Sequence, residues 1–276
     1  MKIRQIEKTD LPAVQALLGE GFPRKSSAYW QRALETLAAR PQIGDLPRFG
    51  MLLETDGQTE GVMLMIASET AGRAFCNLSS WYVRPAARKY APFLFQRSLR
   101  WKGVTYTDCS PAAHVLPIIE KFGFRPYSGG TLLLDGRAGL RRGAELQTLT
   151  NDNLGRIDPA LRASIMAHLA YGCQGILLEE PNQPPTPLLY RKARLRRHVP
   201  AARFLFGDPG LVARNAGPLM RRLLGRGIVL ALVDARLGET YTTGRILPDY
   251  SRRYFKGDTA PVIGDLRETE MALFGF

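Results

Sequence analysis

A cationic segment directly after an apolar stretch is the first feature of this chain that indicates chemistry. Residues 75–83 are expected to form a buried strand, and residues 84–90 (Arg-Pro-Ala-Ala-Arg-Lys-Tyr) follow as a basic turn. Ala91 and Pro92 then open a helix, since proline is favoured in the first helical turn. The first N–H groups of a helix have no partner within it, and the helix dipole favours negative charge there. The sequence therefore predicts an anion site at this helix start.

A second group of reactive side chains follows the next expected strand, residues 104–107. Asp108 could accept a proton directly or through a water molecule, and Ser110 lies beside it in the following turn. Tyr82 and His114 are further candidates for moving protons at the same place. The alternative role for Asp108 and Ser110 is that of a helix cap, because both residue types are preferred at helix N-termini.

The order of these elements resembles the core of the GNAT (GCN5-related N-acetyltransferase) superfamily. The resemblance rests on the strand that ends at Val83, the turn with Arg88, the helix and strand that follow, and a second helix ending in Lys-Phe-Gly-Phe at 121–124. It covers roughly the first half of the chain. It implies an acyltransferase that uses acetyl-coenzyme A or a longer acyl-coenzyme A, with direct attack by an amine or hydroxyl acceptor.

The resemblance also implies which residues hold the donor. In the GNAT family the first strand separates from its neighbour, and its free backbone groups bind the pantetheine arm like an added strand. The turn and the helix start bind the pyrophosphate. In this chain the corresponding residues are Trp81, Tyr82 and Val83 on the strand, and Arg88, Lys89, Tyr90, Ala91 and Phe93 at the turn and helix.

Three positions depart from the family pattern. Ala91 and Phe93 stand where the family has glycines, and Ile119 stands where many members have a tyrosine that protonates the leaving thiolate. A phenylalanine would crowd a bound pyrophosphate, and Pro92 supplies no N–H donor. These departures leave open another class of function, a catalytically silent GNAT-like module that binds a partner.

The second half of the chain repeats the order of elements. A strand, a turn, a helix and a buried strand are expected in succession, at residues 203–206, 207–210, 217–224 and 228–233. Arg214 and Pro218 repeat the spacing of Arg88 and Pro92. A short helix or turn at 250–257 and a last strand within 266–276 would complete this half.

The predicted organisation is therefore two tandem GNAT-like domains. Residues 1–136 form the first, residues 137–155 connect the two, and residues 156–276 form the second. Each domain is expected to have an α/β (α+β) fold, with a mixed, mostly antiparallel sheet flanked by helices.

The composition limits the partners and the compartment. The net charge of +13 over 276 residues favours an anionic partner, although a solvated arginine-rich surface gives the same charge. The three cysteines and three histidines are scattered without metal-ligand spacing, so no metal site is expected. The sequence has no apolar run long enough to span a bilayer, which predicts a soluble cytoplasmic protein.

The basic run at residues 190–198 is compatible with a different acyl donor, an aminoacyl-tRNA. The Fem-like transferases, which also contain tandem GNAT-like units, take their acyl group from an aminoacyl-tRNA. A basic surface of this kind would suit such a nucleic-acid partner. The sequence thus allows an acyl-coenzyme A acyltransferase, a tRNA-dependent transferase or a silent binding module.

Overall fold

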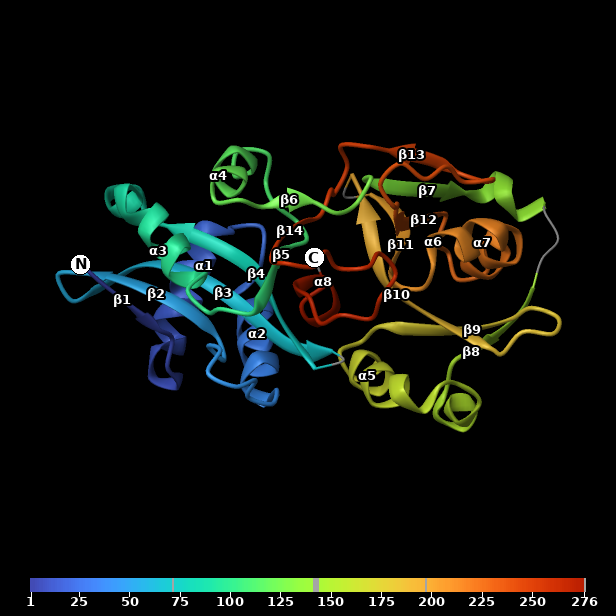
Figure 1. Ribbon diagram of the computed structural model, residues 1–276, viewed down its shortest axis with the longest axis horizontal. Coiled ribbons are helices and arrows are strands. Elements are labelled where there is room, and N and C mark those ends of the chain that lie inside the picture. The colour runs from blue at the N-terminus through green and yellow to red at the C-terminus, as the bar shows by residue number, and fades with distance from the viewer. Residues whose placement is uncertain (71, 141–143, 197, 276) are drawn as a thin grey trace. The chain divides into compact units, whose positions relative to one another are not determined.

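The computed structural model divides the chain into two compact units, each built around a seven-stranded sheet (Figure 1). Unit 1 comprises Met1–Arg125, Phe255–Ala260 and Glu268–Glu270, and unit 2 comprises Pro126–Tyr254, Pro261–Arg267 and Met271–Phe276. The structure describes residues 1–70, 72–140, 144–196 and 198–275.

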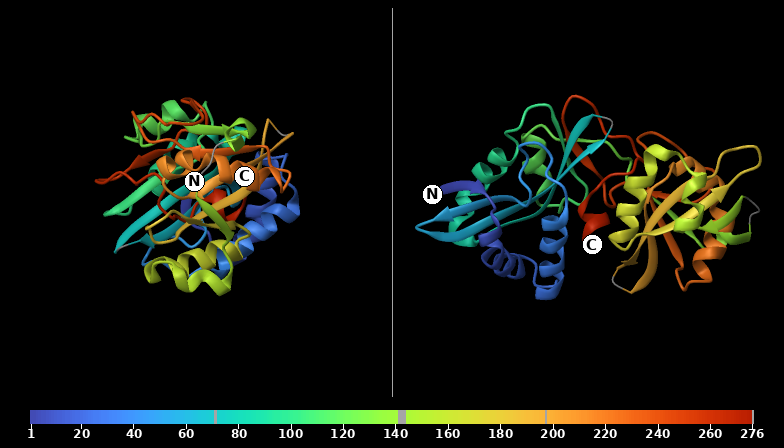
Figure 2. Two further views of the ribbon diagram at one scale, coloured as in Figure 1. Left: turned by 90° about the vertical axis from the view of Figure 1, so that its right-hand side faces the viewer. Right: turned by 90° about the horizontal axis from the view of Figure 1, so that it is seen from below.

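The first sheet has the strand order β1-β2-β3-β4-β5-β14-β6. From β1 to β4, each strand pairs antiparallel with the next one along the chain, and β3 and β4 form a long hairpin (Figure 2). Strands β4 and β5 pair parallel, which makes the sheet mixed. The strand bounds are β1 (Lys2–Gln5), β2 (Gly50–Thr55), β3 (Gln58–Thr70), β4 (Arg73–Val83), β5 (Val104–Asp108), β6 (Arg125–Pro126) and β14 (Tyr254–Lys256).

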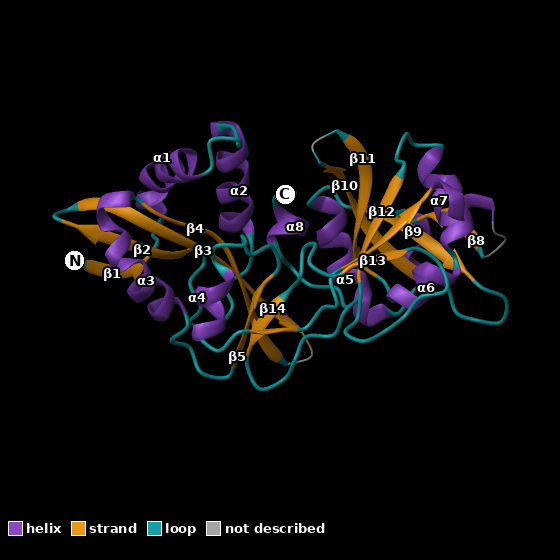
Figure 3. Ribbon diagram, turned by 90° about the horizontal axis from the view of Figure 1, so that it is seen from above, coloured by secondary structure: helices purple, strands orange, loops and turns teal. Residues whose placement is uncertain are grey.

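Helices cover both faces of the first sheet. Figure 3 shows α1 (Leu11–Gly21) and α2 (Ser27–Ala39) on one face, and α3 (Ala91–Ser98) and α4 (Leu116–Lys121) on the other. Helix α2 begins where its sequence predicts a cap, since the Ser26 hydroxyl accepts a hydrogen bond from the Tyr29 N–H at 3.2 Å. Two 3₁₀ helices, η1 (Lys8–Asp10) and η2 (Pro85–Tyr90), precede α1 and α3.

The second sheet has the strand order β13-β7-β12-β11-β10-β9-β8. Strands β11 and β12 pair parallel, and the neighbours on either side pair antiparallel. The bounds are β7 (Thr131–Asp135), β8 (Glu145–Thr148), β9 (Gln174–Glu179), β10 (Thr186–Leu195), β11 (Val199–Phe206), β12 (Leu230–Asp234) and β13 (Arg245–Leu247).

Two clusters of buried hydrophobic side chains join the second sheet to its helices. The larger joins alternate residues of the strands, such as Phe204 and Val233, to α6 (Pro209–Arg214) and α7 (Ala216–Leu224). The smaller lies against α5 (Pro159–Ala170). The remaining elements are η3 (Gly136–Leu140), η4 (Asn151–Arg156) and α8 (Glu270–Leu273).

The fold class predicted from the sequence is confirmed, because each unit has a mixed, mostly antiparallel sheet flanked by helices. Two strands lie outside the domains expected for them. Strand β7, expected in the first domain, pairs with β12 in the second sheet. Residues 254–256, expected within a short helix or turn of the second domain, instead form strand β14 of the first sheet.

The expectation of a last strand within residues 266–276 is wrong. The described part of that segment contains the short helix α8, and the strand lies earlier, at β14. Gly257 follows β14 directly and explains its position, because a Cβ on that residue would lie 3.0 Å from the Cα of Thr105 on β5. A glycine is needed for so close an approach of two backbones.

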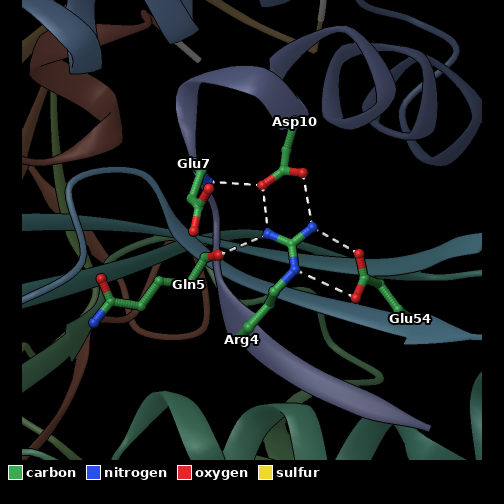
Figure 4. Close-up of polar contacts among 5 residues, drawn as sticks. All are labelled: Arg4, Gln5, Glu7, Asp10 and Glu54. Carbon is green, nitrogen blue, oxygen red and sulfur yellow. Dashed lines mark hydrogen bonds and ion pairs between the residues drawn. The ribbon is translucent and has the colours of Figure 1, made fainter. Parts of the chain in front are cut away.

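The edge strand β1 is held to its neighbours by a partly buried ion cluster (Figure 4). The Arg4 guanidinium donates to both carboxylate oxygens of Asp10, at 2.6 and 2.8 Å, and to Glu54 on β2, at 2.6 Å. Asp10 also accepts the Glu7 N–H at 2.7 Å, which fixes the entry to η1. The hydrogen bonds from Arg4 hold the pKa of Asp10 below its ordinary value, against the opposing effect of its partial burial.

Replacing Asp10 by Asn should lower the free energy of unfolding of unit 1 by about 1 kcal/mol near neutral pH, because the partly buried Arg4 loses one of its two carboxylate partners. A carboxyl whose pKa is depressed on folding stabilises the protein above its ordinary pKa, and this contribution is lost as the pH falls. The difference between D10N and the native chain should therefore shrink below about pH 4.

Urea unfolding followed by tryptophan fluorescence measures this effect, since Trp30, Trp81 and Trp101 are the chain's three tryptophans and all lie in unit 1. Glu69→Gln, at an exposed position on β3, is the matched control. A D10N effect that does not change with pH would contradict the role given to the ion cluster.

Candidate functional site

Strands β4 and β5 separate part-way along unit 1. They pair from Ala74 with Val104 to Asn77 with Thr107, and no further pair between them follows among the described residues. Strand β4 continues beside β3 as far as Val83, which pairs with Gly61. Residues 78–83 therefore present one backbone edge that β5 does not cover.

A β-bulge turns β4 away from β5. Leu64 of β3 pairs with Ser79 and Val62 pairs with Tyr82, so Ser80 and Trp81 together oppose a single residue of β3. Ser80 has φ of 53°, a left-handed conformation that few residues other than glycine adopt. Bulges of this kind bend a strand and increase its twist.

Aromatic packing supports the diverging part of β4. The Trp81 ring lies 4.9 Å from the ring of Phe95 on α3, measured between centroids. Phe95 in turn packs against Phe122 at 4.9 Å and Phe124 at 5.8 Å, both after α4. The Lys-Phe-Gly-Phe segment seen in the sequence thus stabilises α3 and, through it, the course of β4.

A buried polar network lies where the two strands part. The Thr107 hydroxyl donates to Asn77 Oδ1 at 3.2 Å, and the Asn77 amide donates to Glu270 at the start of α8. The Ser110 hydroxyl donates to the other carboxylate oxygen of Glu270 at 2.6 Å. Asp108 completes the group, since its Oδ1 accepts the Ser110 N–H at 3.2 Å.

The electrostatics of this network favour a neutral Asp108 near physiological pH. Burial, followed by the negative charge of Glu270, raises the pKa of Asp108 to about 8, and the hydrogen bond from the Ser110 N–H opposes this shift. A group with such a pKa can both accept and release a proton near neutral pH. The turn after β5 is therefore suited to acid–base chemistry.

Asp108 and Ser110 do not cap the following helix. Helix α4 begins at Leu116, and its N-cap is Val115. His114 is exposed in the turn before α4, and Ile119 is fully buried on it. The cap alternative considered from the sequence is thus not observed, and no acid–base side chain occupies the Ile119 position.

The segment expected as a basic turn is the 3₁₀ helix η2. At the junction with α3, the backbone carbonyl of Arg88 accepts a hydrogen bond from the Ala91 N–H. Arg88 and Lys89 are exposed, and Tyr90 and Ala91 are partly buried. Two cations thus face solvent between the end of β4 and the start of α3.

The first arginine of this segment has a structural role. Arg84 forms an ion pair with Glu20 at 2.6 Å and a longer one with Glu60 at 3.4 Å, and it donates to Thr59 O at 3.0 Å. It therefore fixes the end of β4 against β3 and α1.

The other candidates occupy both sides of β4. The Tyr82 ring packs on Gly21 of α1, where an added Cβ would lie 2.4 Å from the ring, and Val83 is buried. The side chain of Phe93 is 53% exposed and lines an open cavity along α3 with Arg97. The ring of Phe93 therefore leaves the backbone at the helix start less crowded than its sequence position suggests.

Sequence reasoning did not identify Asn77 and Glu270. Asn77 gives a weak signal, because it is a polar residue between Cys76 and Leu78 in an otherwise apolar strand. Glu270 gives none, since it is 160 positions away from Ser110, its hydrogen-bond partner. Only the tertiary structure brings the two together.

Comparison with known proteins gives a result at the level of structure. No family model matches the sequence, and no curated protein matches it. A GCN5-related N-acetyltransferase from Anabaena variabilis aligns over 92% of this chain and 72% of its own, with a TM-score of 0.59 and 11% identity. The chain has the GNAT fold.

Two further structures agree. A GCN5-related N-acetyltransferase from Kribbella flavida covers 92% of this chain and 71% of its own, with a TM-score of 0.57 and 11% identity. The glucosamine N-acetyltransferase region of a fungal multi-domain β-N-acetylglucosaminidase covers 92% of this chain and 38% of its own, with a TM-score of 0.58 and 13% identity.

Unit 2 repeats the central feature of the GNAT fold. Strands β11 and β12 pair parallel from Ala201 with Leu230 to Arg203 with Leu232, as β4 and β5 do in unit 1. A register shift against β10 follows in β11, at Leu205. The two sheets are thus consistent with a tandem duplication. Among the described residues, no helix has the length and apolar character needed to cross a bilayer.

Replacing Glu270 by Gln should lower the pKa of Asp108 from about 8 by about one pH unit, because one nearby negative charge is removed while burial remains. A ¹³C NMR titration of the aspartate carboxyl groups measures this, with Asp108→Asn identifying the resonance. Glu120→Gln, at an exposed position on α4, is the control. A pKa for Asp108 that is the same in E270Q would show that the two carboxyl groups do not interact.

Proposed function

We propose that this protein transfers an acyl group from acetyl-coenzyme A, or a longer acyl-coenzyme A, to an amine or hydroxyl acceptor in unit 1. The observation that carries the proposal is the separation of β4 from β5 at the end of β5, where Asp108 has a pKa suited to acid–base chemistry. The GNAT fold, shared with the N-acetyltransferases compared above, supports the same reaction class.

The residues beside the uncovered edge of β4 fit an acyl-coenzyme A. The Trp81 ring packs on Phe95 and supports this part of β4. Backbone groups of Trp81, Tyr82 and Val83 would hold the pantetheine arm by strand addition. A backbone N–H near Tyr82 would stabilise the oxyanion.

The phosphates would bind at the start of α3. Arg88 and Lys89 are exposed there and would supply charge-assisted hydrogen bonds. Tyr90 and Phe93 would supply backbone contacts, and Ala91, whose N–H donates to Arg88 O, would allow a close approach through its small side chain. Phe93 can remain in this set because its side chain faces the open cavity along α3. When bound, the coenzyme supplies an activated acyl group as a thioester.

Asp108 would carry the proton transfer. Its carboxylate accepts the proton that the acceptor loses on attack, and the resulting carboxylic acid then releases that proton to the departing thiolate. One residue can serve both steps because its pKa of about 8 is close to the working pH. This dual role would replace the tyrosine that Ile119 displaces.

Ser110 and Glu270 would position this acid–base group. Ser110 touches both partners, donating its N–H to Asp108 and its hydroxyl to Glu270. Asn77 donates to the other carboxylate oxygen of Glu270, and Thr107 donates to Asn77. Tyr82 has its ring packed on Gly21, so its contribution would come from the backbone. The structures compared above give no support to the aminoacyl-tRNA alternative.

Asp108→Asn should reduce kcat at least about 100-fold with little change in KM for the donor, because a general base is lost while donor contacts remain. In the native chain the rate should rise with pH through about 8, as Asp108 loses its proton. Release of free thiol from acetyl-coenzyme A, measured over a panel of amine and hydroxyl acceptors, provides the assay. A rate unchanged in D108N would remove Asp108 from the mechanism and favour a silent module if no acceptor works.

The double variant Arg88→Ala, Lys89→Ala should weaken binding of acetyl-coenzyme A by about tenfold or more, since two charge-assisted contacts are lost. The rise in melting temperature that acetyl-coenzyme A causes measures this without an acceptor. Arg97→Ala with Lys102→Ala removes two exposed cations from the same unit and is the control. Equal losses in both double variants would contradict the assignment of the donor site.

A further inference from the structure

An open cavity of about 400 Å³ lies in unit 2 where the β10–β11 hairpin meets the loop between α7 and β12. Three cations line it, Lys192 and Arg194 from β10 and Arg226 from the loop. All three are exposed, and no aspartate or glutamate is among the described residues that line the cavity. This basic depression therefore presents charge of one sign to solvent.

Strand alternation places the three cations on one face of the second sheet. Lys192 and Arg194 follow Tyr190 at every second position of β10, so their side chains share its face. The Tyr190 ring is buried in the core that includes α7, and its hydroxyl accepts a hydrogen bond from Arg226 at 2.7 Å. The cations thus extend the α7 face of the sheet beyond its buried part.

The charges of the basic depression are not neutralised by carboxylates. Other arginines of unit 2, such as Arg203 and Arg236, form ion pairs with aspartates. Among the described residues, Lys192, Arg194 and Arg226 form no ion pair, and Arg226 donates only to hydroxyl groups. Exposed charges of one sign raise the local concentration of a partner that carries the opposite charge.

Two exposed aliphatic side chains lie close to each other at the same end of unit 2. Leu224 ends α7 and is 40% exposed, and Val229 precedes β12 and is 38% exposed. A Cβ on Gly136 would lie 3.7 Å from Leu224 Cδ1. Asp135 pairs antiparallel with Leu230, and continuing this register by one residue places Val229 opposite the same glycine.

The loop after α7 connects this aliphatic pair to the basic depression. Arg226 lies between Leu224 and Val229 in the sequence and lines the cavity. The Val229 N–H donates at 3.1 Å to the carbonyl of Pro200, which also lines it. Cations and exposed aliphatic groups thus form one continuous surface of unit 2.

This combination fits the surface of an anionic membrane, because the cations attract lipid headgroups and the aliphatic groups enter the interface. No aromatic side chain, on which unpaired bases would stack, is among the described residues that line the cavity. We infer that unit 2 docks through this surface on an anionic phospholipid membrane. Lipid phosphates lie beside Lys192, Arg194 and Arg226, and Leu224 and Val229 enter the interfacial layer. This docking does not depend on acyl transfer in unit 1.

Co-sedimentation of the full chain with vesicles tests the docking surface. Vesicles of equal parts phosphatidylglycerol and phosphatidylcholine should bind the chain, with an affinity that falls as the salt concentration rises. Vesicles of phosphatidylcholine alone should not bind it. The double variant Lys192→Gln, Arg194→Gln should bind the anionic vesicles at least about tenfold more weakly, because each cation near such a surface contributes about fivefold.

A second double variant, Leu224→Ser with Val229→Ser, tests the aliphatic contact. It should weaken binding to the anionic vesicles about threefold or more without changing the salt dependence, because only apolar contact is lost. All four substituted residues are exposed, so both double variants should fold.

The matched control is Arg97→Gln with Lys102→Gln, which removes one arginine and one lysine, both exposed, from unit 1. Vesicle binding that is lost in K192Q/R194Q and kept in the control supports the docking surface. Equal losses in these two double variants would show attraction by net charge alone and overturn the inference. No binding to the anionic vesicles would overturn it as well. Binding of duplex RNA that K192Q/R194Q abolishes, with no vesicle binding, would assign the surface to nucleic acid instead.

Discussion

The separation of two parallel strands is the constraint on which the rest of unit 1 depends. Strands β4 and β5 stay paired for only four residues each, and the bulge at Ser80 then turns β4 away. The rings of Trp81 and Phe95 fill the space beside the diverging strand. A fully paired β5 would cover the edge of β4. The opening thus leaves a surface for a ligand beside Asp108, whose pKa is raised by burial and by the charge of Glu270.

The polar network connects Glu270, at the start of α8, to residues of β4 and of the turn after β5. Glu270 accepts hydrogen bonds from Asn77 and Ser110, and its charge adds to the burial that raises the pKa of Asp108. A buried carboxylate is costly unless its oxygens are satisfied, and both are. In unit 2 the residue that ends the matching strand, Asp234 of β12, is paired with Arg203 and Arg253. The carboxyl group that ends this strand therefore lies near another carboxylate in unit 1 and is paired with two arginines in unit 2.

The sequence was informative where a feature is local. The strands at β4 and β5, the helix begun by Ala91 and Pro92, and the repeated order in the second half follow from apolar runs and helix-start residues close together in the chain. The placement of β7 and β14 could not be predicted, because the pairing partner of a short strand is set by tertiary contacts. Glu270 was missed for the same reason. The 3₁₀ conformation of residues 85–90 also has no distinct signal, as its residues suit a turn equally well.

The most direct measurement of the central claim is a crystal structure of the chain with a non-hydrolysable acetyl-coenzyme A analogue. The account predicts that the pantetheine arm lies along residues 81–83 of β4, that the phosphates contact Arg88 and Lys89, and that the Asp108 carboxyl faces the acyl carbon. An analogue bound at any other place, with the edge of β4 beyond Asn77 left uncontacted, would contradict the account.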